Sequence, residues 1–160
     1  MTRLFIPQGD RAWFFDSPSF HDWETSNSGI LWCHDLPGSG KSILMAQAIH
    51  RLQQDAIAPT LVLSHFCDHR DPQSQNPDLI FRNFIYQAAS QSQPVLKNLA
   101  ECTEYQEAKT KKRKCRPQEI ERILLDVCNR DRNFVLVVDG LDECSEEAEG
   151  SRQDQKYWRS

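Results

Sequence analysis

The hydrophobic positions of this chain follow two patterns, and the first consists of short apolar runs that predict strands. Residues 134–138 form an uninterrupted run without the alternation of a half-exposed strand. Such a run predicts a strand that is buried on both faces, as in a parallel sheet. Residues 30–34 and residues 60–67, which follow Pro59, predict two further strands.

The second pattern is the period of an amphipathic helix. Residues 41–54 carry apolar side chains at spacings of three and four, which predicts one buried stripe. Asn76 is a favourable N-cap for a helix with Pro77 at its first position, and Pro94 and Pro117 predict two more helix starts. A short helix is predicted from Ser17-Pro18. The apolar positions expected on helix faces are Phe20, Trp23, Met45, Ala48, Ile49, Leu52, Ile80 or Phe81, Phe84, Ile85, Ala88, Val95, Leu96, Leu99, Ala100, Ile120, Ile123, Leu124 and Val127.

The order of the strands and of the helices that follow them is β-α-β-α-α-α-β. This order predicts an α/β fold with a mostly parallel sheet and right-handed crossovers. A length of 160 residues corresponds to about one domain. Apolar residues make up 39% and charged residues 26%, which are the proportions of a globular chain.

Charge and composition also exclude several classes of protein. The net charge of −4 gives no overall basic field for nucleic acid. The chain has no apolar run of membrane-spanning length, and residues 7–10 interrupt any signal-peptide core, so a cytoplasmic location without membrane partners is expected. The six cysteines lack a C-x-x-C spacing and are expected to be free thiols, several of them buried.

The turn after the first apolar strand carries the main candidate chemistry. The residues concerned are Pro37, Gly38, Ser39, Gly40, Lys41, Ser42 and Ile43. Two glycines, a lysine and a hydroxyl residue at the start of a helix are typical of a loop that binds the phosphates of a nucleotide, with the lysine on the β- and γ-phosphates and the hydroxyl on Mg²⁺. The full pattern G-x-x-x-x-G-K-[ST] requires glycine at position 35, where this chain has Asp35. Aspartate tolerates left-handed backbone, so the turn is expected to form, although a glycine-rich turn that only caps a helix is the alternative.

A second candidate site follows the strand at residues 134–138. Asp139 stands at its carboxyl end, where α/β sheets bind ligands, and fits the Walker B aspartate that holds magnesium. Asp142 and Glu143 follow closely enough for one of them to orient an attacking water. The alternative interpretation is a buried strand followed by a solvated acidic loop.

Two other clusters have simpler explanations. Six of the eight residues at 109–116 are basic, but no aromatic residues are interleaved for base stacking, so a solvated loop is favoured over a nucleic-acid patch. His65, Cys67 and His69 would share one face of a strand, but no fourth zinc ligand is evident.

Together these motifs resemble the NACHT domain of the STAND class of P-loop NTPases, in particular the large fungal NACHT proteins. The resemblance rests on residues 29–34 leading into P-G-S-G-K-S-I-L, on F-C-D-H-R-D at residues 66–71 and on V-D-G-L-D-E-C at residues 138–144. It implies a lead-in segment at residues 1–29, a partial NACHT domain at residues 30–146 and an irregular tail at residues 147–160. The implied fold is a three-layer P-loop NTPase-like fold, expected to stop after the Walker B strand.

The resemblance also implies a function. Such domains are nucleotide-operated switches that bind ATP or GTP with Mg²⁺, hydrolyse it slowly and oligomerise, and in fungi they are associated with non-self recognition. By position, residues 37–43 would hold the nucleotide, Ser42 and Asp139 the magnesium, and Asp142 or Glu143 the catalytic water. Expected partners are nucleotide, further copies of the chain or full-length NACHT proteins. The alternative is a truncated, non-catalytic module that associates with full-length NACHT proteins.

Overall fold

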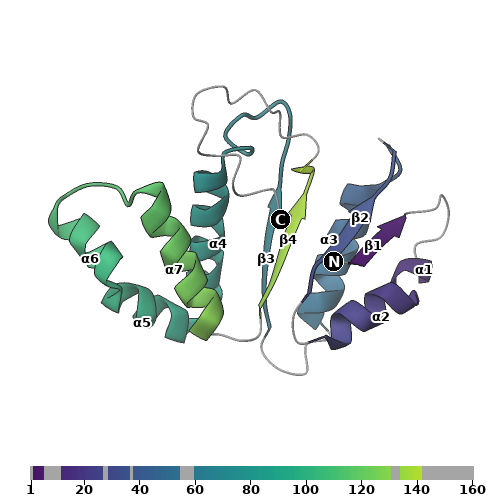
Figure 1. Ribbon diagram of the computed structural model, residues 1–160, viewed down its shortest axis with the longest axis horizontal. Coiled ribbons are helices and arrows are strands. Elements are labelled where there is room, and N and C mark those ends of the chain that lie inside the picture. Colours follow the sequence, from purple (N-terminus) through teal and green to yellow (C-terminus); the bar gives the residue numbers. More distant parts are fainter. Residues whose placement is uncertain are drawn as a thin grey trace. The chain divides into compact units, whose positions relative to one another are not determined.

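The computed structural model describes residues 2–5, 12–26, 29–36, 38–54, 60–130 and 134–141 (Figure 1). The chain divides into two compact units, residues 1–55 and residues 56–160. The elements, in chain order, are β1 (Thr2–Phe5), α1 (Ala12–Phe15), α2 (Pro18–Thr25), β2 (Leu31–His34), α3 (Lys41–Gln54), β3 (Leu61–Phe66), α4 (Pro77–Gln91), α5 (Gln93–Glu101), α6 (Thr103–Thr110), α7 (Pro117–Arg130) and β4 (Phe134–Asp139).

The first unit is a two-stranded parallel sheet packed against helices. β1 pairs with β2 in register, with Thr2 opposite Leu31 and Phe5 opposite His34. The buried core consists of Phe14, Phe20, Leu44 and Ala48, which come from α1, α2 and α3. Leu31 and Cys33 of β2 pack against this core, so one face of β2 supports the helix that follows it.

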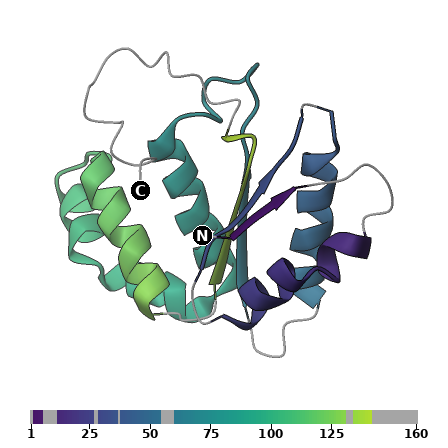
Figure 2. The same cartoon turned by 45° about the vertical axis from the view of Figure 1, so that its right-hand side comes forward.

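The second unit is also built on a parallel pair, β3 and β4, with Leu61 opposite Phe134 and Phe66 opposite Asp139. Helix α4 lies between this pair and α7, while α5 and α6 form the connection between the two long helices (Figures 1 and 2). Parallel strands linked by helices are compatible with the predicted α/β class, but the described strands form two separate two-stranded sheets and not the one sheet expected.

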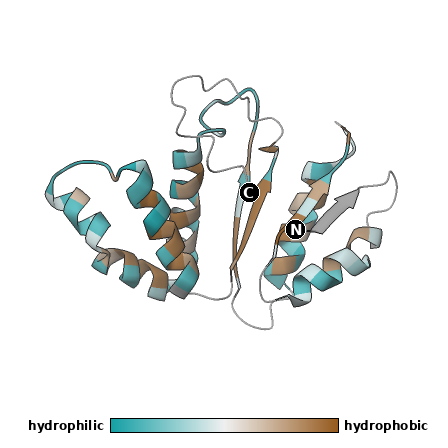
Figure 3. Ribbon diagram, in the orientation of Figure 1, coloured by the Kyte–Doolittle hydropathy of each residue, from teal (hydrophilic) through white to brown (hydrophobic). Residues whose placement is uncertain are grey.

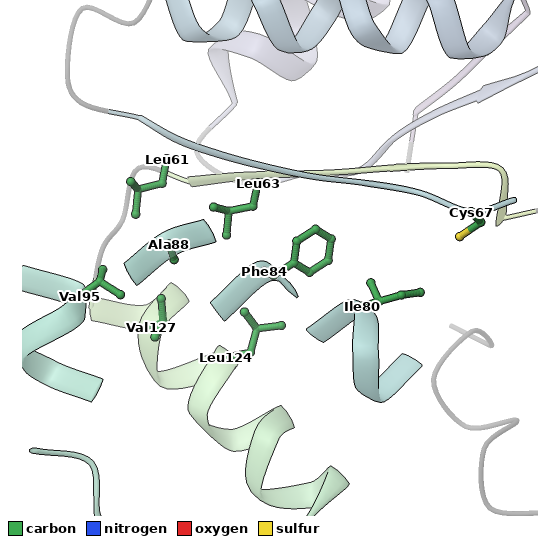
Figure 4. Close-up of a cluster of buried hydrophobic side chains, with 9 residues drawn as sticks. All are labelled: Leu61, Leu63, Cys67, Ile80, Phe84, Ala88, Val95, Leu124 and Val127. Atoms are coloured by element: carbon green, nitrogen blue, oxygen red, sulfur yellow. The ribbon is translucent and has the colours of Figure 1, made fainter. Parts of the chain in front are cut away.

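The core of the second unit forms where β3, α4 and α7 meet. Side chains from alternate positions of β3 point toward α4, and α7 covers the other side of α4 (Figure 4). The buried residues of this core are Leu61, Leu63, Cys67, Ile80, Phe84, Ala88, Val95, Leu124 and Val127. The ribbon coloured by residue hydropathy shows apolar positions along β3 and β4 and on one side of α4 and α7 (Figure 3). The periodicity predicted for α4 and α7 is therefore confirmed.

The predicted helix starts are also confirmed where a cap can be identified. The Asn76 side chain accepts a hydrogen bond from the Asp78 N–H, with Pro77 at the first position of α4. Ser17 caps α2 in the same way through the Phe20 N–H. Helix α5 begins at Gln93, one residue before the prediction, because the Ser92 side chain accepts from the Val95 N–H and acts as the cap. Capping side chains and prolines at the first turn therefore determine where these helices begin.

Four expectations need correction. Leu44, and not Met45, is the most buried apolar residue of α3, because its side chain meets the aromatic core of the first unit. Leu136 is 40% exposed, so β4 is not buried on both faces along its whole length. Leu96 and Ala100 are exposed on α5, where Val95 is the buried residue. Strand β1 and helix α6 were not predicted, since neither has a strong apolar pattern of its own.

The basic segment at residues 109–116 starts in the last turn of α6 and continues as a mostly exposed loop, as the sequence favoured. The Arg113 N–H donates to the Ala108 carbonyl, and Lys112 has a φ of 49°, which is the left-handed residue of a Schellman ending. The Arg113 guanidinium forms two hydrogen bonds to the Glu119 carboxylate, at 2.7 and 2.8 Å. This ion pair joins the end of α6 to the start of α7, and Arg113 is the one of the six basic residues that takes part in it.

The Arg113–Glu119 pair predicts an acid-sensitive contribution to stability. The Arg113 guanidinium lowers the pKa of Glu119 from 4.5 to about 2. Because the folded pKa is the lower one, the stabilisation is complete above the unfolded pKa and disappears as the pH falls through the folded pKa. We expect the free energy of unfolding of Glu119→Gln to depend less on pH than that of the wild type between about pH 5 and pH 2.

Urea unfolding across this pH range measures the difference. Glu101→Gln, which removes an exposed carboxylate from α5, is the matched control and should retain the wild-type pH dependence. Parallel curves for the wild type and Glu119→Gln would contradict the prediction.

Candidate functional site

The predicted phosphate loop lies between β2 and α3 and has the backbone that its glycines allow. Gly38 has a φ of 80° and Gly40 a φ of 89°, both in the left-handed region where glycine carries no steric penalty. The Ser39 N–H donates to the Leu36 carbonyl at 3.3 Å, and the Leu44 N–H donates to the Gly40 carbonyl at 3.0 Å. The loop is therefore a tight turn that leads directly into α3.

Lys41 reaches back across this turn. Its Nζ donates to the carbonyl oxygens of Asp35 at 3.0 Å and Leu36 at 3.2 Å. The ammonium group thus lies on the loop side of α3, at the positive end of the helix dipole. A cation held beside free helix N–H groups is an arrangement that attracts phosphate.

Asp35 fits the loop without strain. Among the described residues Lys112 is the one non-glycine residue with a positive φ, so Asp35 does not adopt the left-handed backbone considered above. Its carboxylate accepts a hydrogen bond from the Leu36 N–H at 2.7 Å. Asp35 therefore replaces glycine at no backbone cost, but its carboxylate takes one N–H group at the start of the loop.

The remaining loop residues differ in accessibility. Ser42 and Ile43 are exposed at the start of α3, which leaves the Ser42 hydroxyl accessible to solvent. The Ser39 hydroxyl is buried and has no hydrogen-bond partner among the described residues. Pro37 lies outside the described residues.

Aromatic side chains of α1 and α2 pack against β2 and α3, the two elements that flank the loop, and only part of this arrangement was predictable from the sequence. Trp23 donates its indole N–H to the Gly29 carbonyl at 3.3 Å, just before β2. Arg51 of α3 lies over the rings of Phe15 and Phe20, at 4.8 and 5.6 Å from their centroids. The pairing of Phe20 with Trp23 was predictable from their spacing, whereas the position of Arg51 depends on tertiary packing.

The thiol closest to the loop in sequence is not a nucleophile at neutral pH. Burial raises the pKa of Cys33, on β2, to about 11. The thiol is then protonated at neutral pH, so Cys33 offers no covalent chemistry there.

Asp139 occupies the carboxyl end of β4 in the second unit, as predicted. Asp139 is 9% exposed, and its backbone carbonyl accepts a hydrogen bond from the Cys67 N–H at 2.9 Å. The next residue, Gly140, has a φ of 72°, and a Cβ at this position would lie 2.6 Å from the Cys67 carbonyl oxygen. The D-G pair therefore requires glycine for two reasons, its backbone conformation and the close approach of the neighbouring strand.

The loop that follows β3 begins at the same edge as Asp139, and His65 of β3 contacts this loop. His65 Nε2 is 2.7 Å from the Ser74 carbonyl oxygen, and its Nδ1 is 3.3 Å from Nδ2 of Asn83. Both ring nitrogens therefore have protein partners. Within the described ranges no group of three potential metal ligands is assembled, so the idea of a zinc cluster around residues 65–69 has no support there.

Asp142 and Glu143 lie outside the described residues, so their predicted catalytic role stays a prediction. The phosphate loop belongs to the first unit and Asp139 to the second. In the part of the chain that the structure describes, no helix is long and apolar enough to cross a membrane.

Comparison with known proteins gives two matches. The family model described as Nephrocystin 3, N-terminal matches residues 9–156. The vegetative incompatibility protein HET-E-1 of Podospora anserina is 30% identical over 86 residues, which is 53% of this chain. The aligned region is 6% of the length of HET-E-1, so the similarity concerns a small part of that protein. No solved structure matches the chain.

Proposed function

Because this chain belongs to the Nephrocystin 3 N-terminal family, we propose that it is a nucleotide-binding module that takes a nucleoside triphosphate, with ATP the first candidate and GTP the second, together with Mg²⁺. The observation that carries the proposal is the geometry of the loop between β2 and α3. Two glycines with positive φ turn the backbone there, and Lys41 lies across it at a helix N-terminus. A ligand with several adjacent negative charges is the kind that such a loop recognises.

The assignment of individual residues follows the sequence motifs. Residues 37–43 bind the phosphates, with Lys41 on the β- and γ-phosphates. The Ser42 hydroxyl and the Asp139 carboxylate bind Mg²⁺, which neutralises phosphate charge when it is bound. Asp142 or Glu143 orients the water in a slow hydrolysis.

We further propose that the module is part of a NACHT-type signalling switch. The similarity to HET-E-1 supports this context, because that protein is named for vegetative incompatibility. A role in fungal non-self recognition, with further copies of the chain or full-length NACHT proteins as partners, follows from this context. Association of this kind does not require rapid turnover.

A second candidate function is a non-catalytic interaction module, and Asp35 is the observation that favours it. Its carboxylate occupies the Leu36 N–H and adds a negative charge at the start of the loop. Both effects weaken phosphate binding. Magnesium-dependent nucleotide turnover by the purified chain would exclude this alternative.

The magnesium assignment gives a direct test of the proposed function. Titration of ATP and of GTP, with and without Mg²⁺, should show tighter binding with Mg²⁺ for the wild type. In Asp139→Asn, an isosteric change, we expect the gain on adding Mg²⁺ to fall by about tenfold, because a neutral amide is a poorer Mg²⁺ ligand than a carboxylate. The magnesium-free affinity is the internal reference and should not fall, because the loss of a carboxylate near the phosphates removes a repulsion.

Two results would contradict the proposal. Absence of binding of both nucleotides to the wild type would exclude a nucleotide site. An equal magnesium effect in the wild type and in Asp139→Asn would remove Asp139 from the magnesium site.

A further inference from the structure

A row of amide side chains on α4 lies against β3 within the second unit. Asn83, Gln87 and Gln91 are four residues apart along the helix, so they share one of its faces. The Asn83 amide contacts the His65 ring, and the two glutamines contact the backbone of β3. Gln87 is half-buried and Gln91 is exposed, so the row lies at the surface of the unit and not in its core.

The Gln87 amide forms two hydrogen bonds with one residue of β3. The Ser64 N–H donates to Oε1 of Gln87 at 2.9 Å, and Nε2 of Gln87 donates to the Ser64 carbonyl at 2.8 Å. A residue in a parallel sheet offers the same N–H and carbonyl to a neighbouring strand. The side chain of Gln87 therefore takes the place that a strand would have beside Ser64.

Gln91 continues this contact one helical turn further along. Its Nε2 donates to the Val62 carbonyl at 3.5 Å, which is a longer and weaker bond than those of Gln87. Four residues of a helix advance about 6 Å, and two residues of a strand advance about 6.6 Å. Residues spaced by four on α4 therefore stay in step with alternate residues of β3.

These contacts lie on the edge of β3 that points away from β4. The Cys67 N–H donates to the Asp139 carbonyl at 2.9 Å, so the N–H groups of the odd-numbered residues of β3 point toward β4. The peptide groups of Val62 and Ser64 point the opposite way, to what we call the second edge of β3. Among the described strands none pairs with this second edge. The two glutamines thus cover an edge that has no described strand partner.

The sequence of β3 makes an uncovered second edge prone to self-pairing. Residues 60–67 contain no Asp, Glu, Lys, Arg or Pro, and residues 61–63 are all apolar. Natural edge strands are commonly protected by such charges and prolines, so β3 lacks this protection in its own sequence. Apolar segments of low charge pair readily with identical segments. A second copy of the chain carries the identical segment and is the partner that fits this edge.

We propose that Gln87, together with Gln91, closes the second edge of β3 and prevents a second copy of the chain from adding its own β3 strand there. The amide of Gln87 is part of the same molecule, so its hydrogen bonds form without the entropic cost of association. A second copy would have to displace both bonds before it could pair with Ser64. This inference concerns the second unit alone and does not depend on nucleotide binding.

Sedimentation velocity of the full chain at increasing protein concentration tests the proposal. Gln87→Ala opens the edge beside Ser64, so its average mass should rise to about twofold that of the wild type at the same concentration, as expected for pairing of two copies. Gln91→Ala removes one long hydrogen bond and should give a smaller rise. Gln118→Ala removes an exposed glutamine from α7 and is the matched control, with the mass of the wild type.

Hydrogen exchange of peptides that contain Ser64 locates the association. In dilute Gln87→Ala these peptides should exchange faster than in the wild type, because the Ser64 N–H has lost its acceptor. The exchange should slow again at concentrations where the variant associates. A rise in mass without this slowing would place the association on another surface and overturn the proposal.

Two further results would also overturn it. A folded Gln87→Ala with the mass of the wild type at every concentration would show that the amide has no role in preventing association. If circular dichroism shows that Gln87→Ala does not fold, Gln91→Ala decides the question, because its side chain is exposed. A mass of Gln91→Ala equal to that of the wild type would then exclude the protective role.

Discussion

Replacement of Lys41 with alanine is expected to weaken the binding of Mg²⁺–ATP by about a hundredfold or more, since a charged hydrogen bond to phosphate contributes about 1.5–3 kcal/mol and Lys41 is assigned two phosphates. The structure gives the physical reason. The ammonium group lies on the loop side of α3, within 3.2 Å of the two carbonyl oxygens at the start of the loop. Isothermal titration calorimetry on the purified chain measures the change.

The interpretation of this variant depends on whether the loop keeps its structure. Lys41→Ala also removes the two hydrogen bonds to the carbonyls of Asp35 and Leu36, so a change in circular dichroism would indicate a loss of fold rather than of a ligand contact. Lys97→Ala, on α5, removes a lysine of the same charge from an exposed position and should bind as the wild type does. Equal ATP affinities for Lys41→Ala and the wild type would mean that the loop is only a helix-capping turn.

The second large effect is expected for Gly140→Ala, which should destabilise the second unit by about 3 kcal/mol. Two costs add up in this variant, a left-handed backbone and a steric overlap. The φ of 72° is unfavourable for alanine, and its Cβ would lie 2.6 Å from the Cys67 carbonyl oxygen. That oxygen belongs to the backbone at the end of β3 and cannot move without disturbing the strand pair. Hydrogen exchange of peptides from β3 and β4 reports this loss of stability directly.

Gly38→Ala is the matched control for the steric part of this effect. Gly38 has a φ of 80°, but a Cβ there would have no atom within 4 Å. Gly38→Ala should therefore destabilise the first unit by about 1 kcal/mol, which is the cost of the left-handed backbone alone. If Gly140→Ala and Gly38→Ala had equal effects on their units, the contact with Cys67 would not be a determinant of stability.

The sequence predicted the parts of the fold that depend on local patterns. Helices α4 and α7 carry a strong apolar period and begin at a proline, and α4 also has an asparagine cap, so their stripes and starts followed from neighbouring residues. Helix α6 escaped prediction because Ala108 is its one buried residue among those described. Strand β1 escaped because its pairing with β2 joins segments far apart in the chain, and no local signal encodes that pairing.

The chemistry of the candidate site stays a prediction from the sequence, and its geometry was predictable only in part. The spacing of Gly38, Gly40 and Lys41 predicted a phosphate loop, and the positive φ of both glycines agrees with it. The direction in which Lys41 points and the hydrogen bond of Asp35 to its neighbour are results of folding.

The pairing of β3 with β4 also determines when this sheet can form during synthesis of the chain. Helices α4 to α7 lie between the two strands, and β4 is the strand that pairs with β3 in the described part of the chain. The peptide groups along one edge of β3 therefore have no strand partner until all of these helices have been made. An open edge of an apolar strand is a site at which nascent chains pair with one another.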